Sequence, residues 1–210
     1  MKKLFFISLS AALLWVGSAA TFAQVDRSDP EALIKTATQQ IINEVRQGAI
    51  RQGDTQSVIS LVDRDVLPYF DFQRTTQLAA GRAWLNATPS QQFALVDQFE
   101  QLLTRTYSGA FAQIKPDQQI DFKPFRAAPS DTEVVVRTVV TNNGQAIQID
   151  YGLEKTGNGW RLYDWSVQGK WLTATYQRQF AKTLSQSGVD GLIRFLSQRN
   201  EKLGSGKQTR

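Results

Sequence analysis

Carboxylates are the side chains of this chain best suited to chemistry, because its 210 residues include neither histidine nor cysteine. These absences exclude Ser-His-Asp and cysteine nucleophile systems, and carboxylates alone are a poor ligand set for zinc or copper. Asp164 stands out because it lies within GWRLYDWSVQGKW (159–171), a stretch that holds three of the five tryptophans. This stretch could form an active site or the wall of an apolar cavity.

A catalytic role for Asp164 requires a second carboxylate beside it, as in paired general acid and base sites. Asp150 and Glu154, on the preceding segment, are the available partners. The alternative is a structural carboxylate that accepts hydrogen bonds from nearby backbone or from Arg161. We favour the structural interpretation and expect no catalysis, no metal and no cofactor. A periplasmic enzyme that uses Asp164 with Asp150 or Glu154 in a pocket stays as the alternative.

The first residues are typical of a secretory signal peptide. Lys2-Lys3 is a short basic start, residues 4–16 are mostly apolar, and small residues precede the cleavage that we place after Ala23. The apolar run is too short and too diluted for a membrane span, which needs roughly 20 apolar residues. We expect residues 24–203 to form a single exported domain, with residues 204–210 as a disordered tail.

Charge favours no polyanionic partner. The net charge of +5 would become +3 once Lys2 and Lys3 leave with the signal peptide. No cluster of lysine and arginine is interleaved with aromatic residues, so we expect no nucleic-acid binding. A third class of function, an interaction module that recruits other proteins without a ligand, would need an apolar patch that is closed and empty.

Apolar residues recur at helical spacing in the first half of the chain. The pattern predicts helices over about 30–47, from the cap Asp54 to before Pro68, from the cap Asp71 to Gly81, and over about 89–114. Thr88-Pro89-Ser90-Gln91 has the spacing of a capping box.

From Ile120 the apolar period changes to two, which predicts four strands, the last three forming an antiparallel meander. Two helices, over about 172–186 and 189–200, close the chain on either side of Ser187-Gly188. The predicted fold is α+β: N-terminal helices, a small four-stranded antiparallel sheet, and C-terminal helices that enclose an apolar pocket.

Strand alternation divides residues 160–167 into two faces, and both carry large apolar groups. Such a strand is covered on both sides, by helices or by a ligand. We take the face with Tyr163, Trp165 and Val167 as the inward one.

Three stretches together resemble the MlaC family, the periplasmic phospholipid-binding proteins also known as toluene-tolerance proteins. They are DFQRTTQLAAGRAWLNATPSQQFALVDQFEQLLTRTYSGAF (71–111), WRLYDWSVQGKWLTATYQRQF (160–180) and GVDGLIRFL (188–196). The Asp-Phe start, the Gly-x-x-Trp centre and the Trp-x-x-Tyr-Asp strand of the family are present. Lys170-Trp171 departs from the Val-Ser that often follows the glycine of that strand.

The resemblance implies a soluble periplasmic carrier that shuttles phospholipid between an outer-membrane lipoprotein complex and an inner-membrane ABC transporter with its MCE-domain protein. Such a carrier maintains the lipid asymmetry of the outer membrane and catalyses no reaction. A monomer is the simplest state for a diffusing shuttle.

A carrier of this kind needs an apolar lining with few polar anchors. The residues expected to line the pocket are large and apolar or aromatic: Phe70, Leu78, Phe99, Leu103, Tyr107 and Phe111 from helices, and Ile147, Ile149, Tyr151, Tyr163, Trp165 and Val167 from the sheet. Arg82, Lys170 and Arg178 are the candidates for transient contacts with a phosphate headgroup.

Overall fold

The structure, a computed structural model, describes residues 26–49, 54–142 and 144–205. The predicted signal peptide (1–23) and the end of the predicted tail (206–210) lie outside these residues. Among the helices described, none is long and apolar enough to cross a membrane. The elements follow the order helices, sheet, helix, as expected for the α+β fold.

Two helices open the described chain. Helix α1 (Pro30–Arg46) begins at Asp29, whose carboxylate accepts a hydrogen bond of 2.7 Å from the backbone N–H of Ala32. Helix α2 (Thr55–Asp65) is capped in the same way by Asp54 and is followed by the short 3₁₀ helix η1 (Leu67–Tyr69). Helix α1 ends one residue before the predicted position 47, and α2 ends before Pro68, as predicted.

A second group of helices follows. Helix α3 (Phe72–Ala80) begins at Asp71, and α5 (Pro89–Phe111) begins at Thr88 with the predicted capping box. Between them lies α4 (Arg82–Leu85), a single turn that the sequence did not predict. Helix α5 ends three residues earlier than predicted.

The sheet has five strands rather than four. They are β1 (Gln119–Phe122), β2 (Glu133–Asn142), β3 (Gln145–Thr156), β4 (Gly159–Val167) and β5 (Lys170–Trp171), each antiparallel to its neighbour and in chain order. The additional strand is the two-residue β5, formed by Lys170 and Trp171, the pair that departs from the pattern of the family that the sequence resembles. Strand β1 ends before Pro124, which has no N–H to donate to a ladder.

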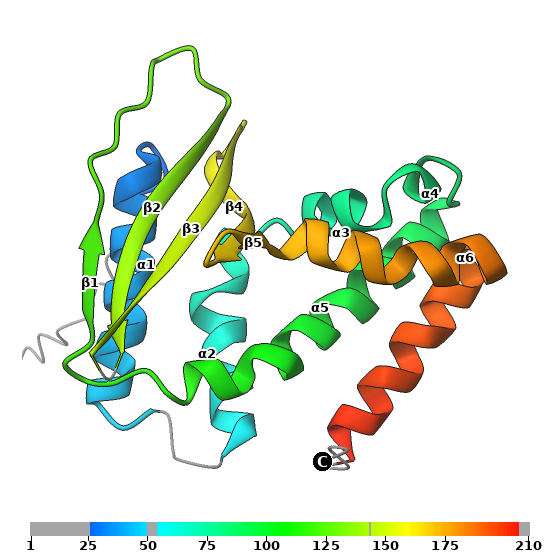
Figure 1. The fold of residues 1–210 in the computed structure, drawn as a ribbon, viewed down its shortest axis with the longest axis horizontal. Helices are drawn as coiled ribbons and strands as arrows, with labels where there is room; N and C mark the ends of the chain where they lie inside the picture. The colour runs from blue at the N-terminus through cyan, green and yellow to red at the C-terminus, as the bar shows by residue number, and fades with distance from the viewer. Residues whose placement is uncertain (1–25, 50–53, 143, 206–210) are drawn as a thin grey trace, which may run out of the picture.

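Helix α6 (Leu172–Gly204) contains the two predicted closing helices. They meet at Gly188, whose φ of 62° and ψ of −162° bend the chain sharply. Only glycine adopts that conformation without strain. The second part of α6 turns back from the first (Figure 1), and it includes Gly204, the first residue of the predicted tail.

Two apolar cores hold the chain together. Figure 1 shows α1 beside the sheet, whereas most of α3, α4, α5 and α6 extends to the other side of the molecule. The first joins α3, α4, α5 and α6 around Phe99 and Phe180, both almost fully buried. The second joins Leu33 and Ile34 of α1 to Val136, Leu153 and Trp160 of the sheet. A cavity lies between these cores.

Candidate functional site

An apolar cavity of about 480 Å³ lies between one face of the sheet, here called the inner face, and helices α1, α2 and α5. The inner face carries Ile147, Ile149 and Tyr151 of β3. Most of the other lining residues are also apolar or aromatic: Leu33, Ile34, Ala37, Ile41, Ile42, Val62, Val66, Tyr69, Phe70, Phe72, Leu103, Tyr107, Ala110, Phe111, Ile114, Ile120, Val140, Leu162, Trp165 and Val167.

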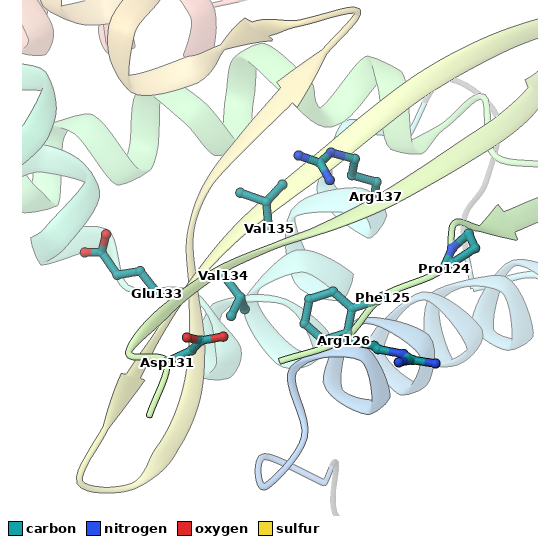
Figure 2. A pocket seen from close by; sticks show the side chains of 8 residues that line it. All are labelled: Pro124, Phe125, Arg126, Asp131, Glu133, Val134, Val135 and Arg137. Atoms are coloured by element: carbon teal, nitrogen blue, oxygen red, sulfur yellow. The ribbon is translucent and has the colours of Figure 1, made fainter. Parts of the chain in front are cut away.

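A second hollow, of about 340 Å³, lies at the edge of β2 and has a different character (Figure 2). Its lining includes two arginines and two carboxylates, and it lies beside the loop that joins β1 to β2. It contains none of the residues predicted to form a lipid pocket. The apolar cavity is therefore the candidate site.

The structure brings most of the predicted lining residues together. Those that line the cavity are Phe70, Leu103, Tyr107, Phe111, Ile147, Ile149, Tyr151, Trp165 and Val167. Three others lie elsewhere. Phe99 is buried in the helical core, with its ring 4.8 Å from that of Tyr176 and 5.2 Å from that of Phe180. Leu78 is half-buried on α3 outside the cavity, and Tyr163 points to the opposite face of the sheet.

A β-bulge explains the position of Tyr163. Gly152 pairs with Asp164 and Leu153 pairs with Leu162, which leaves Tyr163 as an additional residue in β4. A β-bulge adds one residue to a strand. Two residues on either side of it can therefore lie on the same face, although strict alternation would place them on opposite faces. Leu162 and Trp165 consequently both line the cavity, whereas strict alternation placed them on opposite faces.

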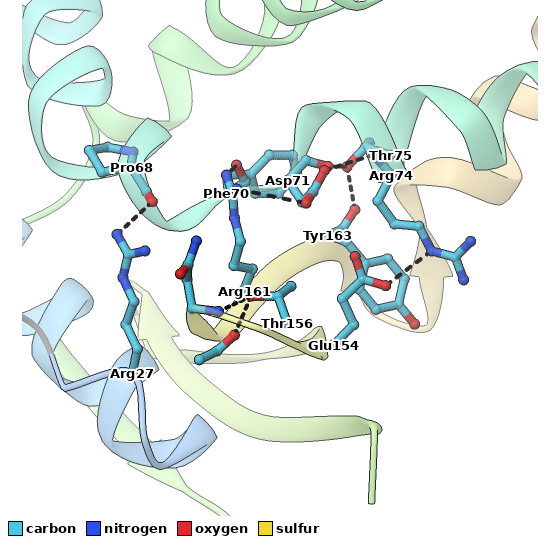
Figure 3. A network of polar contacts seen from close by, with 12 residues as sticks. Arg27, Pro68, Phe70, Asp71, Arg74, Thr75, Glu154, Thr156, Arg161 and Tyr163 are labelled. Atoms are coloured by element: carbon cyan, nitrogen blue, oxygen red, sulfur yellow. Dashed lines mark hydrogen bonds and ion pairs between the residues drawn. The ribbon is translucent and has the colours of Figure 1, made fainter.

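The bulge is held by α3 and the segment before it (Figure 3). The backbone N–H of Asp71 donates to the carbonyl of Leu162 at 2.7 Å, and the hydroxyl of Thr75 donates to the carbonyl of Tyr163 at 2.5 Å. Arg161 donates to the carbonyl of Phe70 at 2.6 Å. These bonds fix the part of β4 that leads into Trp165.

Trp165 connects three walls of the cavity. Its ring lies 5.4 Å from that of Phe70, in the segment before α3, and 5.3 Å from that of Tyr107 on α5. Both contacts are edge-to-face, the arrangement that aromatic pairs favour. The aromatic stretch that stands out in the sequence therefore supplies a cavity wall.

Helix α1 is a part of the lining that sequence reasoning missed, along with residues of α2, η1, β1 and β2. Its contributions include Leu33, Ile34, Ala37, Ile41 and Ile42, the stripe that had predicted a helix. An apolar stripe shows that a helix packs against something, but not whether the partner is a core or a cavity. Position in the fold supplies that distinction.

Comparison with known proteins identifies the family. A sequence model described as MlaC protein matches residues 35–198 of this chain. The chain belongs to the MlaC family. The cavity, built mainly from α1, α5 and the sheet, therefore lies almost entirely within the segment that defines the family.

Two individual proteins are similar to this MlaC-family chain. A solved structure titled as a phospholipid-binding protein from Ralstonia solanacearum, in complex with a phospholipid, is 46% identical with a TM-score of 0.79. The match covers 84% of this chain and 99% of that one. The toluene tolerance protein ttg2D of Pseudomonas putida is 28% identical over 104 residues. That match covers 50% of this chain and 48% of the Pseudomonas protein, so it spans only about half of each.

One end of the cavity in this MlaC-family chain is polar. Gln113 follows α5, Gln118 precedes β1 and Asn142 ends β2, and all three contribute to the lining. Gln119 pairs with Thr141, so these residues gather at one end of the sheet. Val167, which is 40% exposed, also lines the cavity and ends β4 opposite Ile149.

The three cations predicted to contact a headgroup are not part of this lining. Arg82 lies on α4, Lys170 on β5 and Arg178 on α6, and the cavity includes none of them. They were expected to make transient contacts with a headgroup rather than to line the cavity, and that contact stays a prediction. The polar side chains at this end of the cavity are the uncharged amides of Gln113, Gln118 and Asn142.

The carboxylates considered for catalysis lie on the other face of the sheet, here called the outer face. Asp164 accepts hydrogen bonds from the backbone N–H of Trp165 (2.9 Å), the N–H of Thr173 (3.1 Å) and the hydroxyl of Thr173 (2.5 Å). Burial raises the pKa of Asp164, and the bonds from Thr173 and Trp165 oppose that rise. Asp164 therefore accepts hydrogen bonds from nearby backbone, as a structural carboxylate does. The predicted donor Arg161 is not among its partners.

The two suggested partners of Asp164 are also engaged. Asp150 accepts hydrogen bonds from the amide of Gln148 at 3.0 Å and from the hydroxyl of Ser166 at 3.3 Å. Glu154 forms an ion pair of 3.3 Å with Arg74, and burial is the main cause of its raised pKa. Within residues 26–49, 54–142 and 144–205, no three carboxylates group closely enough to hold a metal ion.

Proposed function

We propose that this protein is a periplasmic phospholipid carrier that binds the acyl chains of its ligand in the apolar cavity and catalyses no reaction. The observation that carries the proposal is the cavity itself, an open apolar space of about 480 Å³ in a folded domain. This volume lies within the range of roughly 300–1,000 Å³ that is typical of ligand sites. The phospholipid present in the related Ralstonia structure supports the choice of ligand.

The energetics of a carrier fit a lining of this kind. Exposing acyl chains to water costs about 0.8 kcal/mol for each methylene, so the chains must stay buried during transfer. A membrane buries them equally well. The cavity therefore has to match a bilayer without greatly exceeding it, because a much tighter site would not release its ligand. Apolar contacts meet this requirement, since they supply burial without strong directional bonds.

The headgroup belongs at the polar end of the cavity, beside Gln113, Gln118 and Asn142. A phosphate buried without partners is very costly, so it should stay in contact with water. The side-chain amides in this region can donate hydrogen bonds to a headgroup without requiring that it carry a particular charge. A carrier with this end would accept several phospholipid classes.

The wider role follows from the family. We infer that the protein receives and delivers phospholipid at an outer-membrane lipoprotein complex and at an inner-membrane complex of an MCE-domain protein and an ABC transporter. Such exchange would maintain the lipid asymmetry of the outer membrane. The secretory start of the sequence supports a periplasmic location, and a monomer suits a diffusing carrier.

The test is to express the full chain with its N-terminal sequence in a bacterium, purify the periplasmic product without detergent, and analyse a solvent extract by mass spectrometry. We expect phospholipid in a fixed ratio to protein, with acyl chains of the host membrane. Protein that is folded yet free of lipid, and that takes up none from phospholipid vesicles, would overturn the proposal.

A further inference from the structure

The edge of the sheet beyond β1 is only partly covered. Strand β1 pairs with residues 138–141 of β2, and the ladder ends where the N–H of Lys123 donates to the carbonyl of Arg137 at 2.9 Å. Pro124 follows, and the chain then leaves the sheet until β2 begins at Glu133. The first part of β2 therefore pairs with β3 on one side and has no strand on the other.

The direction of the backbone groups along this edge follows from two hydrogen bonds. The carbonyl of Thr132 accepts from Lys155 next to β3, whereas the carbonyl of Arg137 accepts from Lys123 on the opposite side. Successive residues of an antiparallel strand alternate between the two sides. The N–H and C=O groups of Glu133 and Val135 thus point away from β3, and among the described residues they have no backbone partner.

The polar hollow lies along this edge. Val134 belongs to the inner face and Val135 to the outer face, yet both line the hollow of about 340 Å³, which only an edge position allows. In Figure 2 Pro124, Phe125 and Arg126 lie on the side of the hollow opposite Glu133 and Asp131. The hollow therefore lies between this loop and the first part of β2.

The charges around the hollow are not balanced. Lys123, Arg126 and Arg137 are exposed, and none of their side chains makes a hydrogen bond or ion pair with the part of the chain that the structure describes. The nearby carboxylates are engaged: Asp131 accepts from the backbone N–H of Ala128 at 2.8 Å, and Glu133 pairs with Arg74 at 3.1 Å. Among the four charged residues that line the hollow, the two without such a partner are therefore Arg126 and Arg137, both cations.

We propose that this edge binds an extended, acidic segment of a partner protein, which adds a short strand to β2 beside Glu133 and Val135. Unpaired strand edges bind extended peptides through main-chain hydrogen bonds. The free cations select carboxylates on the incoming segment. They also disfavour a second copy of this chain, because pairing two such edges would bring the same cations together. The edge is separate from the lipid cavity.

The test uses a short acetylated and amidated peptide that alternates valine and glutamate, with its valine–lysine counterpart as the charge control. In the folded, lipid-loaded protein we expect the glutamate peptide to protect the amides of Glu133 and Val135 from hydrogen exchange, and the lysine peptide to leave them unprotected. Equal protection by both peptides, or none from either at millimolar concentration, would refute the proposal.

A backbone variant isolates the hydrogen bond. Val135→Pro removes an N–H that points away from β3, so the β2–β3 ladder should survive, as proline is tolerated on edge strands. Affinity for the glutamate peptide should fall about threefold to tenfold, the effect of one net hydrogen bond. Val135→Thr keeps the N–H and should bind as the parent does. Val135→Pro that folds and binds unchanged would rule out strand addition.

Charge reversal provides a second test that does not depend on proline being tolerated. Arg126→Glu with Arg137→Glu should abolish binding of the glutamate peptide. Arg178→Glu with Lys182→Glu, on the exposed surface of α6, changes the net charge equally and should have little effect. Equal losses in the two double variants would show general electrostatic attraction and contradict a site at this edge.

Discussion

The hydroxyl of Thr75 on α3 donates a hydrogen bond of 2.5 Å to the backbone carbonyl of Tyr163, the residue that the bulge leaves without a cross-strand partner. The same hydroxyl also lies 2.8 Å from the carbonyl of Asp71 one turn earlier. This contact connects a helix of the second helical group to the irregular point of β4. It therefore helps to decide which aromatic side chains of β4 face the cavity.

Thr75→Val should destabilise the protein because it leaves the carbonyl of Tyr163 without this donor at a buried position. The side chain of Thr75 is fully buried, and valine has nearly the same shape. We expect a loss of about 1–3 kcal/mol in the free energy of unfolding, the usual cost of an unsatisfied buried group. Urea denaturation followed by tryptophan fluorescence measures it.

Thr76→Val is the matched control for this prediction. Thr76 is the next residue of α3 and is also buried, but its hydroxyl bonds only to the carbonyl of Phe72 in its own helix. Loss of the Thr76 hydroxyl should lower the free energy of unfolding clearly less than loss of the Thr75 hydroxyl. Equal destabilisation by the two substitutions would mean that the bond to Tyr163 contributes nothing specific.

The same bulge marks the limit of what the sequence could predict. Alternation correctly placed Ile147, Ile149 and Tyr151 on one face, because β3 is regular along that stretch. In β4 it placed Tyr163 with Trp165, and the additional residue at Tyr163 separates them. A bulge depends on partners far away in the chain, here on α3, and no local pattern reveals it.

For the helices as well, the sequence predicted some features and not others. Caps such as Asp29 and Thr88 are local signals, and the helices begin where these residues predicted. Phe99 and Leu103 lie one turn apart on α5 and both belong to the helical core, yet only Leu103 also lines the cavity. Periodicity gives the buried stripe of a helix, whereas its partner at each turn depends on the tertiary arrangement.

Filling the cavity should remove the ligand without unfolding the protein. Ile149→Trp places a large ring on the inner face, where the cavity offers space, so we expect the phospholipid recovered per protein to fall severalfold. Mass spectrometry of solvent extracts measures the ratio, and circular dichroism checks the fold. The indole would occupy space that is otherwise open to acyl chains, so the substitution should lower the amount of bound phospholipid and leave the fold unchanged.

Ala146→Trp is the control for the filled cavity. Ala146 is on the same strand, is exposed, and alternates onto the outer face, so the same aromatic ring would lie outside the cavity. Lipid content should stay at the parent level. If both variants, or neither, lost lipid, the bound molecule would lie elsewhere.

Glu100 should make the protein less stable as the pH rises. Burial is the main cause of its raised pKa, and the charges of Asp63 on α2 and Asp97 on α5 add to it. A carboxyl with a raised folded pKa binds its proton more tightly in the folded state. Its stabilising contribution is therefore complete below the ordinary value of 4.5 and is lost as the pH rises through the folded pKa.

Glu100→Gln should consequently raise the urea midpoint at pH 7, and the difference from the parent should vanish below pH 4.5. Glu201→Gln, at an exposed carboxylate of α6, removes the same charge and should change the midpoint little. A Glu100→Gln variant less stable than the parent at pH 7 would show that the carboxylate makes a favourable contact instead.

Asp164 caps α6 from another element. The N-cap residue of that helix, Trp171, makes no side-chain bond to its first turn, and the carboxylate of Asp164 accepts from the N–H and hydroxyl of Thr173 instead. Asp164→Ala leaves these buried donors unpaired, so the free energy of unfolding should fall by about 1–3 kcal/mol or more. Thr173→Val removes only the hydroxyl and should cost less.

The same variant separates the carrier from the enzyme considered at the outset. Asp164 points to the outer face, towards Thr173, and is not among the residues that line the cavity. Folded Asp164→Ala protein should therefore retain as much phospholipid as the parent, measured on the fraction that elutes at the same volume as the folded parent. Loss of lipid from protein that is still folded would place Asp164 in contact with the ligand and reopen its pairing with Asp150 or Glu154 as an active site.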